Sequence, residues 1–94
     1  YVTAKYAATG LSKSLALELA QYGSTINMIS PGMVETDLLE NMPAKMIEIN
    51  ARQNPLNRNA LPSDVAKLIS FLASEDSDYI NGANLSVNGG SNLI

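Results

Sequence analysis

The stretch LSKSLALELAQYGSTINMISPG, residues 11–32, places a helical pattern directly before a short apolar segment. Apolar residues in its first part recur at the three- and four-residue spacing of one helix face. Gly23 supplies the left-handed stop with which such a helix commonly ends. Residues 25–30 contain two isoleucines and are closed by Pro31-Gly32, which is typical of a buried strand. The sequence therefore predicts a helix that leads into a strand.

The helical pattern reaches back to residue 4 and carries two stripes. The first stripe is apolar and consists of Ala4, Ala8, Leu11, Leu15 and Leu19. The second is made mostly of small residues, which lets another helix or sheet come close, and consists of Ala7, Gly10, Ser14 and Leu17. We expect this helix to end near Tyr22.

After the strand, the pattern becomes irregular and then returns to a helix and a strand. Residues 43–50 predict a short helix with three inward side chains, Met42, Met46 and Ile47. The polar segment that follows, through residue 61, favours a functional lid over a plain linker. Ser63 is expected to cap a helix over residues 64–73 whose buried side carries Val65, Leu68, Ile69 and Leu72. Residues 83–87 predict a last strand, which ends at the turn Asn88-Gly89-Gly90.

Helix, strand, lid, helix and strand form the back half of an α/β pattern with a parallel sheet. Two strands alone would leave both edges of the sheet unpaired and one helix face bare. We therefore expect the chain to be a fragment, or to need a partner segment for stability.

The composition limits the classes of function. The chain has 94 residues, a net charge of -3, 46% hydrophobic and 16% charged residues, which is typical of one globular domain without a basic patch for nucleic acid. No apolar run approaches the ~18 residues that a membrane span needs. Cysteine and histidine are both absent, so disulfides, zinc sites of the usual ligands and a Ser-His nucleophile pair are excluded. The lack of cysteine fits a cytoplasmic protein.

Tyr1 and Lys5 place a phenol and an ammonium at i and i+4, on one helix face. By itself this spacing is weak, because an exposed pair of this kind is common and contributes only about 0.2–0.5 kcal/mol.

Three further segments at matching spacings change this interpretation. With Tyr1-Val-Thr-Ala-Lys5-Tyr-Ala7, the chain resembles the short-chain dehydrogenase/reductase family over its whole length. The other motifs that carry the resemblance are Pro31-Gly32-Met-Val34-Glu-Thr36, Pro62-Ser-Asp-Val65-Ala66 with Phe71-Leu72-Ala-Ser74, and Ile80-Asn-Gly82 with Val87-Asn-Gly89-Gly90. Two departures are Asn81, where the family usually has Thr, and Asn88, where it usually has Asp.

The resemblance implies an α/β fold, namely the C-terminal part of a Rossmann-like doubly wound parallel sheet. In this view residues 1–37 supply the catalytic helix, a strand and a cofactor-contacting loop. Residues 38–61 form the substrate lid, and residues 62–94 form the last helix and strand. A glycine-rich dinucleotide-binding loop is not part of the sequence, so the 94 residues alone are expected to be inactive.

The resemblance also assigns chemical roles. Tyr1 is the expected general acid in carbonyl reduction and general base in alcohol oxidation. Lys5 would favour the phenolate by its charge and would bind the nicotinamide ribose. The cofactor is NAD or NADP, and its expected contacts are Tyr1, Lys5, Pro31, Gly32, Val34 and Thr36. A plainer reading makes Pro31-Gly32 a strand terminator and Thr36 the cap of a helix that starts at Asp37; both readings can hold together.

The substrate is expected to be a small carbonyl compound or alcohol. The activity resembles that of a 3-oxoacyl-carrier-protein reductase, with sugar or polyol dehydrogenases as the alternative substrate class. Three methionines could line a flexible apolar substrate pocket, although packing of the lid helix is favoured: Met33, Met42 and Met46. Arg58 is interpreted as structural.

The resemblance implies a homo-oligomer, a dimer or a tetramer, with neither nucleic acid nor membrane as a partner. The alternative from another class is a non-catalytic fragment or homologue that serves only in subunit assembly.

Overall fold

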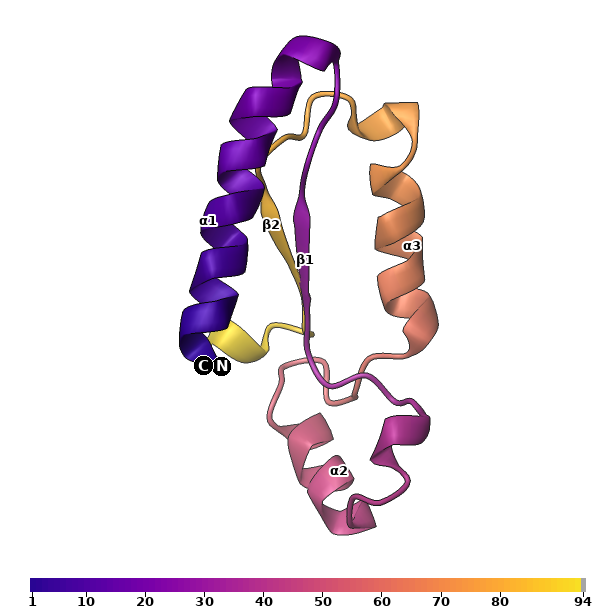
Figure 1. The fold of residues 1–94 in the computed structure, drawn as a ribbon. Helices are drawn as coiled ribbons and strands as arrows, with labels where there is room; N and C mark the ends of the chain where they lie inside the picture. The colour runs from indigo at the N-terminus through magenta and orange to yellow at the C-terminus, as the bar shows by residue number, and fades with distance from the viewer. Residues whose placement is uncertain (94) are drawn as a thin grey trace. The chain divides into compact units, whose positions relative to one another are not determined.

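The computed structural model describes residues 1–93 of the chain (Figure 1). The main elements in chain order are α1 (Val2–Leu19), β1 (Met28–Pro31), α2 (Ala44–Arg52), α3 (Pro62–Leu72) and β2 (Asn84–Val87). Short 3₁₀ turns lie between and after them, at Ala20–Tyr22, Asp37–Leu39, Glu75–Ser77 and Ser91–Leu93. The predicted order of the helices and strands is confirmed, and the lid function of the segment around α2 stays a prediction.

The chain divides into two compact units. The first comprises residues 1–29 and 70–85, and the second comprises residues 30–69 together with the residues from Ser86 onward. Both contain part of the two-stranded sheet formed by β1 and β2. The strands are parallel: Met28 N donates to Ala83 O at 2.8 Å, and four residues further along both strands Gly32 N donates to Val87 O at 2.9 Å.

In the first unit, asparagine side chains join α1 and the two segments that precede the strands. Asn27 Nδ2 donates to Ile80 O at 3.1 Å, and its Oδ1 accepts from Ala83 N at 2.9 Å. Asn81 Oδ1 accepts from Ile26 N at 3.0 Å, while its Nδ2 donates to Ala16 O at 3.2 Å. The strand predicted from residue 25 begins only at Met28. Before it, asparagine side chains satisfy part of the backbone, and Gly82 N donates to Ile26 O at 2.8 Å.

The covered side of α1 within the described residues matches neither predicted stripe, because only Leu15 and Leu19 of the first stripe are half-buried. Its more buried side carries Thr9, Ser12, Leu15, Ala16 and Leu19, of which Ala16 is 3% exposed. On the other side, Leu11 and Leu17 are 61% and 82% exposed. The helix ends as predicted, since Gly23 has a φ of 76° and its N–H donates to Ala20 O at 3.0 Å.

In the second unit, the inward side of α2 agrees with the prediction at Ile47 and differs from it at Met46. Its half-buried face consists of Ile47, Asn50 and Ala51, which are one helical turn apart. Met46 lies off this face and is 57% exposed, so its predicted inward position is wrong. Met42 and Ile47 are half-buried, as expected.

The start of α3 also differs from the prediction. The helix begins at Pro62, so Ser63 lies inside the first turn and is not the cap. Instead Asp64 Oδ2 accepts a hydrogen bond from Leu61 N at 2.8 Å, which satisfies a backbone donor at the helix start. Val65, Leu68 and Leu72 are half-buried as predicted, whereas Ile69 is 53% exposed.

Candidate functional site

Tyr1 and Lys5 lie together at the start of α1. Tyr1 occupies the position before the first helical residue, and Lys5 N donates to Tyr1 O at 3.0 Å. The Lys5 Nζ lies 5.4 Å from the centroid of the Tyr1 ring, within the range of a cation–π contact. Tyr1 is 92% exposed. The first helical turn therefore presents a phenol with an ammonium group beside its ring, open to a ligand.

Gly32 follows β1 in the second unit, and packing explains why it is a glycine. Its N–H donates to Val87 O, and a Cβ at this position would lie 3.1 Å from the Cβ and 3.2 Å from the Cα of Asn88. A side chain at residue 32 would push the two segments apart. The reading of Pro31-Gly32 as a structural terminator is supported, with Pro31 itself the last residue of β1.

Val34 has backbone groups that can receive a ligand. It forms an isolated parallel bridge with Ala60, in which Glu35 N donates to Ala60 O at 2.8 Å and Ala60 N donates to Met33 O at 2.9 Å. In this pattern the N–H and C=O of Val34 itself point to the side opposite Ala60, and neither has a partner among residues 1–93. One free donor beside one free acceptor complements a primary carboxamide.

Thr36 caps the 3₁₀ turn at Asp37–Leu39. Its Oγ1 accepts from Leu38 N at 3.3 Å, which confirms the cap predicted for this residue, although the turn is 3₁₀ rather than α-helical. A hydroxyl that accepts one hydrogen bond still has its own hydrogen to donate. Thr36 can therefore cap the turn and bind an acceptor of a ligand at the same time.

The chemistry of Val34 and Thr36 fits the carboxamide of a nicotinamide cofactor. Both belong to the second unit, while Tyr1 and Lys5 belong to the first. Within the first unit the Tyr1 phenol is exposed, and within the second unit the Val34 backbone groups and the Thr36 hydroxyl can still bond to a ligand. Cofactor contact by Tyr1, Lys5, Pro31, Gly32, Val34 and Thr36 stays a prediction.

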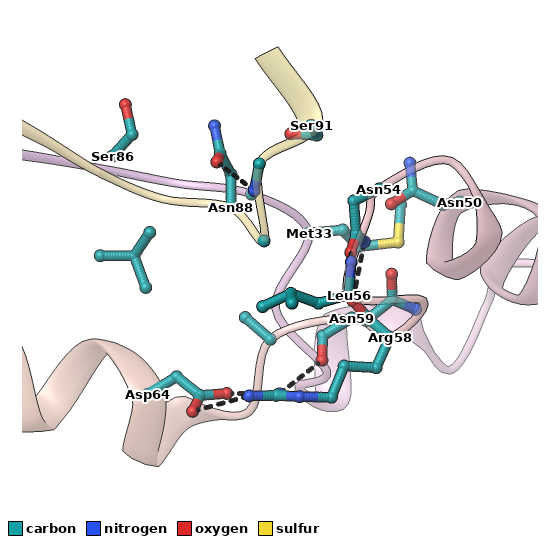
Figure 2. Close-up of a pocket in the computed structure, with 15 residues that line it drawn as sticks. Met33, Asn50, Asn54, Leu56, Arg58, Asn59, Asp64, Ser86, Asn88 and Ser91 are labelled. Atoms are coloured by element: carbon teal, nitrogen blue, oxygen red, sulfur yellow. Dashed lines mark hydrogen bonds and ion pairs between the residues drawn. The ribbon is translucent and has the colours of Figure 1, made fainter. Parts of the chain in front are cut away.

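A cavity of about 270 Å³ lies in the second unit (Figure 2). Met33 is part of its wall, whereas Met42 and Met46 are not. Much of the rest is formed by side-chain amides, those of Asn50, Asn54, Asn59 and Asn88. Its two charged residues, Arg58 and Asp64, form an ion pair, so the cavity offers no unpaired charge.

Two buried asparagines of this unit were missed by the sequence reasoning. Asn54 and Asn59 are 7% and 5% exposed, which is rare for this residue type. Asn59 Nδ2 donates to Ile47 O at 3.1 Å, and its Oδ1 is buried without a partner among the described residues. The signal available in the sequence was the repeated asparagine of residues 50–59, which suggested only a polar segment.

The described residues contain no group of three or more Asp, Glu, His or Cys side chains placed to hold a metal ion. None of the described helices has the length and apolar character that crossing a bilayer requires.

Comparison with known proteins decides the family. The family model described as enoyl-(acyl carrier protein) reductase matches residues 1–92. A solved structure of a short chain dehydrogenase family protein from Francisella tularensis superposes with a TM-score of 0.90 at 33% identity, over all of this chain and 43% of that one. The chain belongs to the short-chain dehydrogenase/reductase family. The resemblance carried by the sequence motifs is confirmed, and so is the partial Rossmann-like fold.

The similar proteins of the short-chain dehydrogenase/reductase family are named after different substrates. The 3-oxoacyl-(acyl-carrier-protein) reductase FabG of Rickettsia felis is 35% identical over all of this chain and 39% of its own length. The L-2,3-butanediol dehydrogenase of Corynebacterium glutamicum is 41% identical over 96% of this chain and 39% of its own length. A 4-hydroxyisoleucine dehydrogenase complexed with NADH has a TM-score of 0.90 at 30% identity, over all of this chain and 40% of that one. The chain thus spans about two fifths of these relatives.

Proposed function

We propose that the protein carrying this chain is an NAD(P)-dependent oxidoreductase that interconverts a carbonyl compound and a secondary alcohol. The observation that carries the proposal is the Tyr1–Lys5 pair on the first turn of α1, in a chain whose residues 1–92 match the family. Relatives named as reductases or dehydrogenases support this class of reaction.

In this proposal Tyr1 moves a proton at the substrate oxygen. In carbonyl reduction its hydroxyl donates a proton to the oxygen, and in alcohol oxidation its phenolate accepts one. The Lys5 ammonium lies 5.4 Å from the centroid of the Tyr1 ring, on the same helical turn. The contact with the Tyr1 ring does not use the N–H groups of the Lys5 ammonium as hydrogen-bond donors. These N–H groups can therefore donate to the hydroxyl groups of a ligand.

The second unit would hold the nicotinamide end of the cofactor. The free N–H and C=O of Val34 would bind its carboxamide, and the Thr36 hydroxyl would donate to a nearby acceptor. When bound, the cofactor supplies or accepts the hydride. The neighbour solved with NADH supports this assignment, and the proposal covers both NAD and NADP.

The substrate class we propose is a 3-oxoacyl thioester, as in the acyl-carrier-protein reductases among the relatives. A diol or sugar alcohol is the alternative, supported by the butanediol dehydrogenase. Turnover of the full-length protein on a short 3-oxoacyl thioester and on a vicinal diol would decide between the two classes.

The proposal is tested by Tyr1→Phe in the full-length protein. Removal of the hydroxyl should lower kcat by about 10²–10⁴-fold, the usual contribution of general acid–base catalysis, and leave the Kd for NADH or NADPH nearly unchanged. Tyr6→Phe is the matched control, because Tyr6 lies on the same helix and is 77% exposed. Normal turnover by Tyr1→Phe would refute the assignment of the acid.

A second candidate is an assembly function without chemistry. It is favoured by the uncovered side of α1, where Leu11 and Leu17 lie beside small residues. An exposed apolar stripe of this kind fits contact with a second copy of the chain, as in the homo-oligomers expected for the family. Catalysis and assembly are compatible, so only inactive full-length protein with bound cofactor would favour assembly alone.

A further inference from the structure

The chain contains two Asn-Gly steps, Asn81-Gly82 and Asn88-Gly89. Asparagine is among the least heat-stable residues, because its side-chain amide can be lost by reaction with the backbone. A following glycine favours this loss, since it lacks a Cβ that would hinder the approach. The two steps have similar local chemistry, so their surroundings decide which of them reacts.

Asn81-Gly82 is held at both reacting groups. Oδ1 and Nδ2 of Asn81 bond to Ile26 N and Ala16 O, which lie far away in the sequence. The nitrogen that would attack, Gly82 N, donates to Ile26 O at 2.8 Å. Reaction at Asn81 would therefore require several hydrogen bonds between distant segments of the first unit to break.

Among residues 1–93, the hydrogen bonds of the Asn88 side chain stay within its own turn. Asn88 Oδ1 accepts from Gly90 N at 3.1 Å (Figure 2). Its Nδ2 donates to Asn92 Oδ1 at 3.3 Å. The N–H of Gly89 has no hydrogen-bond partner among residues 1–93. The attacking atom, Gly89 N, thus has no hydrogen bond to break among residues 1–93. The amide group under attack, on Asn88, is hydrogen-bonded only to residues at most four positions away.

The glycine at residue 89 is also required by the fold. Its φ is +63°, and a Cβ there would lie 2.6 Å from Asn54 Oδ1. A larger residue at position 89 would slow the attack, but its side chain would clash with the buried side chain of Asn54. The fold therefore requires glycine at this position, and the reactive Asn-Gly sequence is kept.

We propose that Asn88 is a site of spontaneous deamidation in the folded protein, and that Asn81 is protected. Gly89 N attacks Asn88 Cγ, a C–N bond forms, and the bond from Cγ to Nδ2 breaks. Ammonia leaves with the proton of the attacking N–H, so that a cyclic imide remains. Water then opens the imide at one of its two carbonyl carbons. Opening gives aspartate or isoaspartate, and either product adds one negative charge.

The two products have different consequences for the turn. Aspartate keeps the acceptor for Gly90 N but loses the donor to Asn92. It is also the residue that the family usually has at this position. Isoaspartate adds an atom to the main chain beside Gly32, where even an added Cβ on Gly32 would lie only 3.2 Å from Asn88 Cα. Isoaspartate should therefore disturb this contact, while aspartate should be tolerated.

The experiment incubates the full-length protein at mildly alkaline pH and follows each Asn-Gly peptide by mass spectrometry, with isoaspartate separated from aspartate by chromatography. In the folded protein, Asn88 should convert about tenfold faster than Asn81, because each hydrogen bond that must break adds to the barrier. In guanidinium chloride both steps should convert at similar rates. Equal rates in the folded protein, or faster loss at Asn81, would overturn the proposal.

Two variants complete the test. Asn88→Gln should remove the charge change of the folded protein on ion exchange, and Asn81→Gln should leave it in place. If Asn88→Gln still gains the negative charge at the original rate, another residue is the modified site and the proposal is wrong. The readout is chemical modification, so it does not depend on whether the proposed oxidoreductase activity is correct.

Discussion

Asparagine side chains take the place of backbone partners at several points of this chain. Asn54 shows the pattern most fully: its Nδ2 donates to Arg58 O at 2.8 Å, and its Oδ1 accepts from Leu56 N at 3.0 Å. Asn27 and Asn81 do the same before the strands. Segments without regular helix or sheet bonding leave backbone groups unsatisfied, and a short amide side chain can donate and accept at once.

Asn57 is the one non-glycine residue of the described chain with a positive φ, at 56°. Asparagine tolerates this left-handed conformation, whereas a β-branched side chain does not. We expect Asn57→Gly to leave the free energy of unfolding nearly unchanged and Asn57→Val to lower it by about 1–2 kcal/mol. Urea unfolding of the full-length protein measures both effects.

The control for this prediction is Asn41→Val. Asn41 is exposed and its φ is not positive, so the same substitution should change the unfolding free energy far less. Equal losses for the two valine variants would show that the backbone conformation of Asn57 is not the cause.

At the scale of elements, the ion pair between Arg58 and Asp64 stabilises the N-terminus of α3. Arg58 Nη1 and Nη2 lie 2.7 Å and 3.2 Å from the two carboxylate oxygens of Asp64, and Leu61 N lies 2.8 Å from Oδ2. The structural role expected for Arg58 is supported. The hydrogen bond from Arg58, followed by that from Leu61 N, lowers the pKa of Asp64 from 3.8 to about 2.

A lowered pKa means that the folded state favours the carboxylate. The stability it contributes is fully present above the ordinary value of 3.8 and is lost as the pH falls through about 2. Asp64→Asn should therefore lower the urea midpoint at neutral pH, with a smaller difference from the unmodified protein at acidic pH. A carboxyl-carbon NMR titration of Asp64 should give the shifted value directly.

The matched control at this scale is Glu48→Gln. It removes the ion pair with Arg52 on α2, whose side chains are 59% and 73% exposed. Exposed pairs of this kind contribute little, so the urea midpoint should hardly move. An Asp64→Asn midpoint as unchanged as that of the control would refute the role of Asp64 at the helix start.

At the scale of the whole molecule, the described residues bury little apolar surface among themselves. Ala16, at 3% exposure, is the one buried apolar residue among them, while Leu17 and Leu38 are 82% and 89% exposed. The expectation that such a chain needs further covering segments fits these exposures. The relatives are about two and a half times as long, and 39–40% of their length is matched.

The assembly proposal belongs to this scale. If the uncovered side of α1 contacts a second copy, Leu17→Lys should place a charge in an apolar contact and reduce the molar mass of the full-length protein in light scattering. Leu38→Lys, which adds the same charge at an equally exposed position outside α1, is the control. A molar mass that is unchanged by Leu17→Lys would exclude this side of α1 as the contact.

Much of the fold followed from local patterns. The period of the apolar residues predicted α1 and α3, and Gly23 and the Asn88-Gly89-Gly90 turn marked ends that the structure confirms. The inward position of Met46 on α2 and the start of β1 were wrong. Both depend on partners distant in the sequence: Asn59 bonds to Ile47 O in α2, and Asn81 bonds to Ile26 before β1. Spacing along the chain carries no information about such partners.

The sequence by itself determined the order of the elements, the parallel α/β pattern and the family, because periodicity, turn residues and motif spacing are local properties. Only the tertiary structure decided what the individual residues contact. The packing against Asn88 requires glycine at position 32, and the bridge to Ala60 points the N–H and C=O of Val34 to the opposite side. Hydrogen bonds protect Asn81, whereas the N–H of Gly89 has no partner among residues 1–93. The physical reason is that each of these contacts joins or separates segments that are far apart in the chain.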